Sequence, residues 1–233
     1  MSSIGNLFKY NFKIMLSNKY IVCAVYCILF PFFLNFTIPE YVMFEIYFSI
    51  IGIVALTDIF RIESYHGISE MIFINNFRRV ATVCIRLIWS MMFIVLLSIL
   101  SYGTMYLKQQ LFPMNQAWLP SYWPALGLSL STSLFLGCIS MTIANLTSNV
   151  ILGYIAGFFY WMICLVNQGY PSILHLFQYS NFVGLSYEDH FLEIGLSKLL
   201  FIVITIILAL SNLLLLRKSP INTRRLIPFG KKH

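Results

Sequence analysis

A long stretch without charged side chains constrains this sequence more than any other feature. No Lys, Arg, Asp or Glu occurs between Lys108 and Glu188. A spanning helix needs about 20 mostly apolar residues, so this stretch has room for more than two spans. Over the whole chain 59% of the residues are hydrophobic and 10% are charged, whereas soluble domains carry about 25% charge. The sequence predicts an integral membrane protein with one membrane domain, residues 1–233.

Six apolar runs each have a length close to that of a membrane span. They are residues 20–36, 41–57, 80–106, 123–146, 150–167 and 196–216. Turn-forming residues separate the runs, as in the Leu146-Thr147-Ser148-Asn149 segment. We therefore expect an all-α fold in which residues 20–216 form a bundle of six transmembrane helices.

Residues 1–19 combine an apolar and a polar helical face. The apolar face is formed by Ile4, Leu7, Phe8, Phe12 and Met15, and the opposite face by Asn6, Lys9, Lys13 and Ser17. This pattern predicts an amphipathic helix in the membrane surface. The alternative is a basic flank that only orients the first span.

The segment 58–86 is the only charge-dense part of the chain between two long apolar runs. Its ionised residues are Asp58, Arg61, Glu63, Glu70, Arg78, Arg79 and Arg86. A bilayer core tolerates such groups only at a cost of several kcal/mol each, so we expect the segment in water, with Arg86 extending to the surface. Ile68, Met71, Ile72 and Phe77 follow near-helical spacing, which predicts a short amphipathic helix offered to a partner. A solvated connecting loop is the alternative, and Gly67 and Asn75-Asn76 are the natural breaks.

The basic residues fall mostly on one side of the predicted topology. With the N-terminus inside, three basic groups are cytoplasmic. They are the lysines before the first span, the arginines of segment 58–86 and the basic tail at residues 217–233. Lys108 and Lys198 fall outside, together with Glu40, Glu45, Glu188, Asp189 and Glu193. We therefore expect cytoplasmic termini, and external segments at 107–122 and 171–195. Residues 171–195 are too polar to span and too apolar for a loop, which predicts short helices in the outer leaflet.

Two runs contain small residues at the spacing of helix contacts. Ser129, Ser133 and Gly137 form a ladder in the fourth run, for which we expect packing within the chain. Gly153 and Gly157 form a GxxxG pattern in the fifth, for which we expect a subunit contact. Packing on the chain's own second or fourth span is the alternative for this pair.

Several kinds of chemistry lack their residues in this sequence. No GxxxxGK[ST] motif is present, so any use of ATP must belong to another chain. Gly127-Leu128-Ser129 has no His in any span that could act as its base, which excludes a serine protease. We expect no catalytic residue, no metal site and no disulfide, and no ionisable group at mid-membrane. The net charge of +7 sets the topology and does not indicate nucleic-acid binding.

The pattern as a whole resembles the permease subunit of a type-2 ATP-binding-cassette (ABC) exporter. The strongest local match is Glu63, Gly67 and Glu70, which resemble the family's E-x-x-x-G-x-x-E at the coupling helix. The chain departs from the family in having no Pro near Asn75-Asn76 and Arg86 in place of a Lys. The resemblance implies a separate ATPase, expected in two copies, that binds ATP and Mg and docks on this chain. The coupling residues would be Arg61, Glu63, Gly67, Glu70, Met71, Phe73, Arg78, Arg79, Lys9 and Lys13.

The resemblance also implies a second permease copy or a paralogue, with the substrate path between the two. The first, second and fifth spans would line it, and their aromatic side chains suit an apolar or amphipathic substrate. The path residues would be Phe30, Phe33, Phe36, Phe158 and Trp161. Small bacterial permeases that export amphipathic peptides, or confer immunity to antimicrobial peptides, are similar in size, which implies the bacterial cytoplasmic membrane. The alternative function is a non-transporting membrane scaffold or sensor.

Overall fold

Six α-helices make up the regular structure of the described residues. The computed structural model describes residues 18–33, 40–60, 76–111, 122–166, 175–177 and 187–218. The helices are α2 (Asn18–Phe33), α3 (Glu40–Leu56), α6 (Asn76–Leu111), α7 (Tyr122–Leu146), α8 (Val150–Val166) and α9 (Tyr187–Lys218). The described part of the chain has no strand, so the predicted all-α fold is confirmed there. Each expected apolar run contains most of one helix.

Three of the helices contain a stretch that is long and apolar enough to cross a membrane. These stretches are Val80–Lys108 in α6, Leu126–Leu146 in α7 and Gly195–Leu215 in α9. The other three helices are apolar but only 16 or 17 residues long. At 1.5 Å per residue such a helix spans roughly 25 Å, a little less than the hydrocarbon core. The three long helices indicate a membrane protein.

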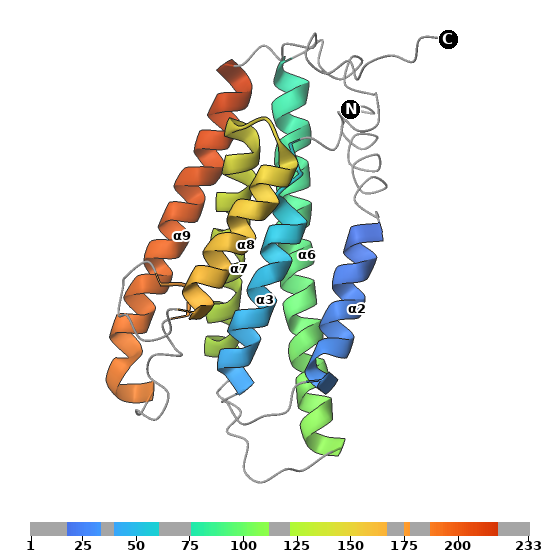
Figure 1. The fold of residues 1–233 in the computed structure, drawn as a ribbon, viewed down its shortest axis with the longest axis vertical. Helices are drawn as coiled ribbons and strands as arrows, with labels where there is room; N and C mark the ends of the chain where they lie inside the picture. The colour runs from blue at the N-terminus through green and yellow to red at the C-terminus, as the bar shows by residue number, and fades with distance from the viewer. Residues whose placement is uncertain are drawn as a thin grey trace.

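Neighbouring helices in the chain alternate in direction (Figure 1). The end of α3, the start of α6 and the end of α9 lie toward one end of the bundle, at the top of Figure 1, and the start of α2 faces the same end from lower down. We name this end, where α3 ends and α6 begins, the charged-loop end, and the opposite one the far end. Helix α7 contacts α3, α8 and α9, while α2 packs on α6 and α3.

Helices α3 and α7 approach each other through small residues. A Cβ atom built on Gly52 would collide with the backbone oxygen of Ser133, and one built on Gly137 would collide with the backbone of Gly52. Without a hydrophobic driving force in lipid, such close backbone contact is a main source of helix association. The expected packing of the fourth run within the chain is confirmed for Ser133 and Gly137.

Gly153 and Gly157 also face the chain's own helices. A Cβ on Gly153 would lie 2.6 Å from Ala144 Cβ of α7 and 2.8 Å from Thr57 Cγ2, just after α3. A Cβ on Gly157 would collide with the Ser140 hydroxyl of α7. The expected subunit contact through these glycines is therefore corrected to an intrachain contact, because both are buried between α8, α7 and the end of α3.

A tight turn joins α7 to α8 at the predicted position. Ser148 has a positive φ of 58°, its N–H donates to Asn145 O at 3.3 Å, and the Asn149 N–H donates to Ala144 O at 3.1 Å. These two bonds form a Schellman motif, which satisfies carbonyls at the end of α7. Asn149 then caps α8, since its side-chain oxygen accepts from the Ile151 N–H at 2.9 Å.

Side chains of α6 satisfy backbone groups that α2 leaves open. Pro31 has no N–H, so the carbonyl of Cys27 lacks its usual donor one turn later. The Thr104 hydroxyl donates to this carbonyl at 3.3 Å. Lys108 Nζ donates to the Pro31 carbonyl at 2.9 Å, close to the end of α2, where carbonyls have no partner within the helix. These bonds hold α2 against α6.

Helices α7 and α9 run in the same direction and share a polar contact near the charged-loop end. Asn145 Nδ2 donates to Asn212 Oδ1 at 2.7 Å, and Asn212 Nδ2 donates to the Thr142 hydroxyl at 2.7 Å. Asn212 is buried, so these bonds replace the water that its amide would otherwise bind.

We expect Gly52→Ala to destabilise the fold and Gly103→Ala to leave it unchanged or slightly more stable. The added methyl at position 52 meets backbone that cannot rotate away, whereas nothing lies within 4 Å of a Cβ at position 103. Overpacking of this kind costs about 1 to 3 kcal/mol. Thermal unfolding in detergent compares the two variants, and equal effects would contradict the close α3–α7 contact.

Candidate functional site

A buried ion pair joins three helices in the half of the bundle nearer the far end. Glu45 of α3 pairs with Lys198 of α9, and the two residues are 2% and 5% exposed. The Thr132 hydroxyl of α7 lies between them, donating to Glu45 Oε1 at 2.8 Å and accepting from Lys198 Nζ at 2.8 Å. Lys198 Nζ also donates to the carbonyl of Leu176 at 2.7 Å. The cluster links α3, α7, α9 and the turn His175–Phe177.

The position of this pair corrects the sequence-based topology in one respect. Glu45 and Lys198 were expected on the watery outer side, with no ionisable group buried in the spans, but the structure buries both side chains among apolar helices. An unpaired charge there would be costly, and pairing with further hydrogen bonds offsets much of that cost. The signal in the sequence was an acid and a base of opposite charge, each a few residues inside an apolar run.

The turn His175–Phe177 contributes apolar side chains to the same region. Leu176 and Phe177 are fully buried and pack with Phe135, Cys164 and Phe201. Helix α9 begins at Tyr187, so residues 187–195 are its first turns and not a separate outer helix. The expected short outer-leaflet helices are therefore corrected for residues 175–177 and 187–195. Residues 171–174 and 178–186 lie outside the described residues.

Two of the predicted path residues contact consecutive residues of α3. Trp161 Nε1 of α8 donates to the Ile46 carbonyl at 2.9 Å. The Phe30 ring of α2 lies 4.3 Å from the Tyr47 ring, centroid to centroid. The structure thus brings Phe30 and Trp161 to the same level of α3, directly after Glu45.

Of the remaining path residues, only Phe158 has a described side chain. Phe158 lies on the outer surface of α8 and is 37% exposed. Phe33 is the last residue of α2, and its side chain is not among those described, while Phe36 lies outside the described residues. Of the predicted path residues, Phe30 and Trp161 are thus the two with described contacts to α3, each to a different residue.

The predicted coupling residues lie almost entirely outside the described residues. This holds for Arg61, Glu63, Gly67, Glu70, Met71, Phe73, Lys9 and Lys13. Arg78 and Arg79 lie in the first turn of α6, which begins at Asn76 as the Asn75-Asn76 break predicts. Residues 1–17 and 219–233, and with them most of the expected surface helix and basic tail, are likewise outside.

Charged residues near the charged-loop end are more buried than expected. Arg86 was expected to reach the cytoplasmic surface, but it is 0% exposed within the bundle, and this prediction is wrong. Lys19 of α2 pairs with Asp58, just after α3, and lies 4.8 Å from the centroid of the Tyr20 ring. The Tyr20 hydroxyl in turn lies 3.2 Å from the Ser90 hydroxyl of α6. These contacts join α2, α3 and α6.

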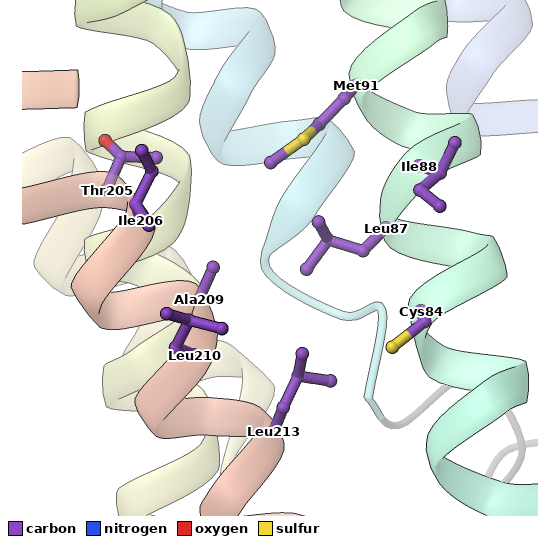
Figure 2. A pocket seen from close by; sticks show the side chains of 9 residues that line it. All are labelled: Cys84, Leu87, Ile88, Met91, Thr205, Ile206, Ala209, Leu210 and Leu213. Carbon is purple, nitrogen blue, oxygen red and sulfur yellow. The ribbon is translucent and has the colours of Figure 1, made fainter. Parts of the chain in front are cut away.

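An apolar groove separates α6 from α9 (Figure 2). It encloses about 270 Å³ and is open on one side. Its walls are Cys84, Leu87, Ile88 and Met91 of α6 and Thr205, Ile206, Ala209, Leu210 and Leu213 of α9. Its lining is almost entirely apolar and holds no charged side chain, which favours apolar groups.

The described residues do not form a metal site or a disulfide. No three His, Cys, Asp or Glu side chains come together there in an arrangement that could hold a metal ion. All five cysteines are free. What the site offers is a fixed polar contact inside the bundle, next to aromatic side chains.

Comparison with known proteins identifies no relative of this chain. No family model, curated protein or solved structure matches it. The resemblance to an ABC exporter permease therefore stays a prediction.

We expect Glu45→Gln and Lys198→Met to destabilise the protein strongly one by one, and much less when combined. Each single change leaves one buried charge without its partner, which typically costs about 3 to 5 kcal/mol, whereas removing both charges is often nearly neutral. Unfolding in detergent is measured for the wild type, the two single variants and the double variant. The four free energies of unfolding give the coupling free energy between the two charges. Additive effects would show that the two charges do not interact in the folded protein.

Proposed function

We propose that this chain is the transmembrane permease subunit of an ATP-driven ABC exporter in the bacterial cytoplasmic membrane. Six helices cross the membrane in this proposal, the three shorter ones with help from flanking residues. A second permease copy or a paralogue completes the path, and a separate ATPase, bound in two copies, supplies ATP and Mg. The substrate is amphipathic or hydrophobic, such as a peptide.

The alternating direction of the helices is the observation that supports this proposal most. It brings both attachment points of residues 61–75 to one end of the bundle, together with the start of α2 and the end of α9 (Figure 1). The basic terminal segments and the charged segment with Glu63 and Glu70 therefore attach at the same end. An ATPase that docks on the cytoplasmic side needs its contact residues gathered in this way.

The surface beside α3 supports the proposed substrate path. Helices α2 and α8 both contact α3 and lie on either side of it in Figure 1. All the exposed side chains described on α2 and α8 are apolar, from Ile21 to Phe32 and from Ile151 to Val166. The interior contact of Gly52 with Ser133 leaves no room for a path between α3 and α7. A path between two copies would thus lie along the exposed faces of α2 and α8, which present aromatic and aliphatic walls.

A non-transporting scaffold or sensor remains the competing function, since tightly packed helices need no path. Copurification under gentle extraction separates the two functions. A nucleotide-binding chain recovered in stoichiometric amount supports the exporter, and its absence supports the scaffold.

We expect Glu63→Ala with Glu70→Ala to leave membrane insertion intact and to lower the ATPase activity coupled to this chain. Both carboxylates belong to the segment proposed to contact the ATPase. Glu188→Ala with Asp189→Ala is the matched control, because it removes two carboxylates from the start of α9 at the far end. Unchanged ATPase activity and export in the Glu63/Glu70 variant would reduce the segment to a connector.

We expect position 70 to be protected from an impermeant thiol reagent in intact cells and labelled after permeabilisation. The substitution Glu70→Cys on a background without native cysteines provides the probe. The cytoplasmic placement follows from the distribution of basic residues. Labelling of intact cells at this position would overturn the topology, and the docking proposal with it.

A further inference from the structure

The ion pair lies directly beside the residues of α3 that meet the aromatic side chains. Glu45 is followed in the chain by Ile46, whose carbonyl accepts from Trp161, and by Tyr47, whose ring meets Phe30. Consecutive residues of a helix rise by 1.5 Å and turn by about 100°. A slip of α3 by one residue would therefore move Tyr47 away from Phe30 and place the carbonyl of a different residue before Trp161.

The two halves of α3 are held by different interactions. Gly52 fixes the second half of the helix against Ser133 and Gly137 of α7 through close backbone contact. In the first half, Glu45 bonds to Thr132 of α7 and to Lys198 of α9. Apolar surfaces can slide past one another with little directional preference, whereas hydrogen bonds and ion pairs specify one position and one rotation.

We propose that Glu45 and Lys198 are positioning residues of the substrate path. Their ion pair fixes the first half of α3 so that Ile46 and Tyr47 meet Trp161 and Phe30. The term substrate path rests on the proposed function. The positioning role does not, because it concerns only how α2, α3 and α8 are arranged. Lys198 also binds the carbonyl of Leu176, so the same cation holds the turn before α9 in place.

A cross-link between α2 and α3 tests the positioning without any transport assay. Phe30→Cys and Tyr47→Cys are introduced together in a background in which the five native cysteines are replaced, and cross-linking by a short bifunctional thiol reagent is measured in membranes. The ion pair is then varied in three forms: intact, charge-free (Glu45→Gln with Lys198→Met) and reversed (Glu45→Lys with Lys198→Glu). Asn145→Cys with Asn212→Cys, near the charged-loop end, is the control cross-link for an intact bundle.

We expect the Phe30/Tyr47 cross-link to form about tenfold more slowly in the charge-free protein and to recover in the reversed one, while the control cross-link stays unchanged. An unchanged Phe30/Tyr47 cross-link in the charge-free protein would overturn the proposal. Loss of both cross-links would make the pair a requirement of folding and would equally overturn a positioning role.

The outcome is distinguishable from a failure of the proposed function. If no ATPase copurifies but the cross-links behave as expected, the ion pair positions α3 in a protein that is not an exporter. If an ATPase copurifies but the cross-linking rate is the same in the charge-free protein, the proposed exporter function is supported and the positioning role is ruled out.

Discussion

Close backbone contact around α7 is the constraint on which the other contacts depend. Gly52 brings α3 onto one face of α7, and Gly153 and Gly157 bring α8 onto another. In lipid there is no hydrophobic driving force between helices. Close contact is instead favoured by dispersion between the packed atoms and by the entropy of the lipid molecules that it displaces. Because α3 and α9 both pack on α7, Glu45 and Lys198 can meet across the hydroxyl of Thr132.

Polar contacts then fix what apolar packing leaves undetermined. Helix α9 has few buried residues in its apolar stretch, and it is attached to α7 by Lys198 with Thr132 near one end and by Asn212 with Asn145 near the other. Helix α2 is attached to α6 by Thr104 and Lys108, which bond to carbonyls left open around Pro31. In a low-dielectric interior each such bond is costly to lose, so the positions of the outer helices are specified by a few side chains.

The same arrangement accounts for the asymmetry of the two ends. At the charged-loop end the chain presents attachment points for the segments richest in charge, which suits a partner in water. In the other half, Glu45 and Lys198 form a buried ion pair, and the exposed side chains described on α2 and α8 are apolar. This division is the physical basis for proposing a soluble ATPase at one end and an amphipathic substrate along α2 and α8.

The sequence by itself determined the helices, because apolar runs of spanning length and the turns between them are local properties. The runs predicted all six described helices, although α9 begins at Tyr187, well before its run at 196–216, and Ser148-Asn149 formed the predicted turn. Only the tertiary structure decided which side chains meet: Glu45 and Lys198 are 153 residues apart, and nothing local indicates their pairing. It also decided that Gly153 and Gly157 face α7, and that Arg86 stays buried. A periodic pattern identifies a face of a helix, whereas the partner of that face is set by packing of the whole bundle.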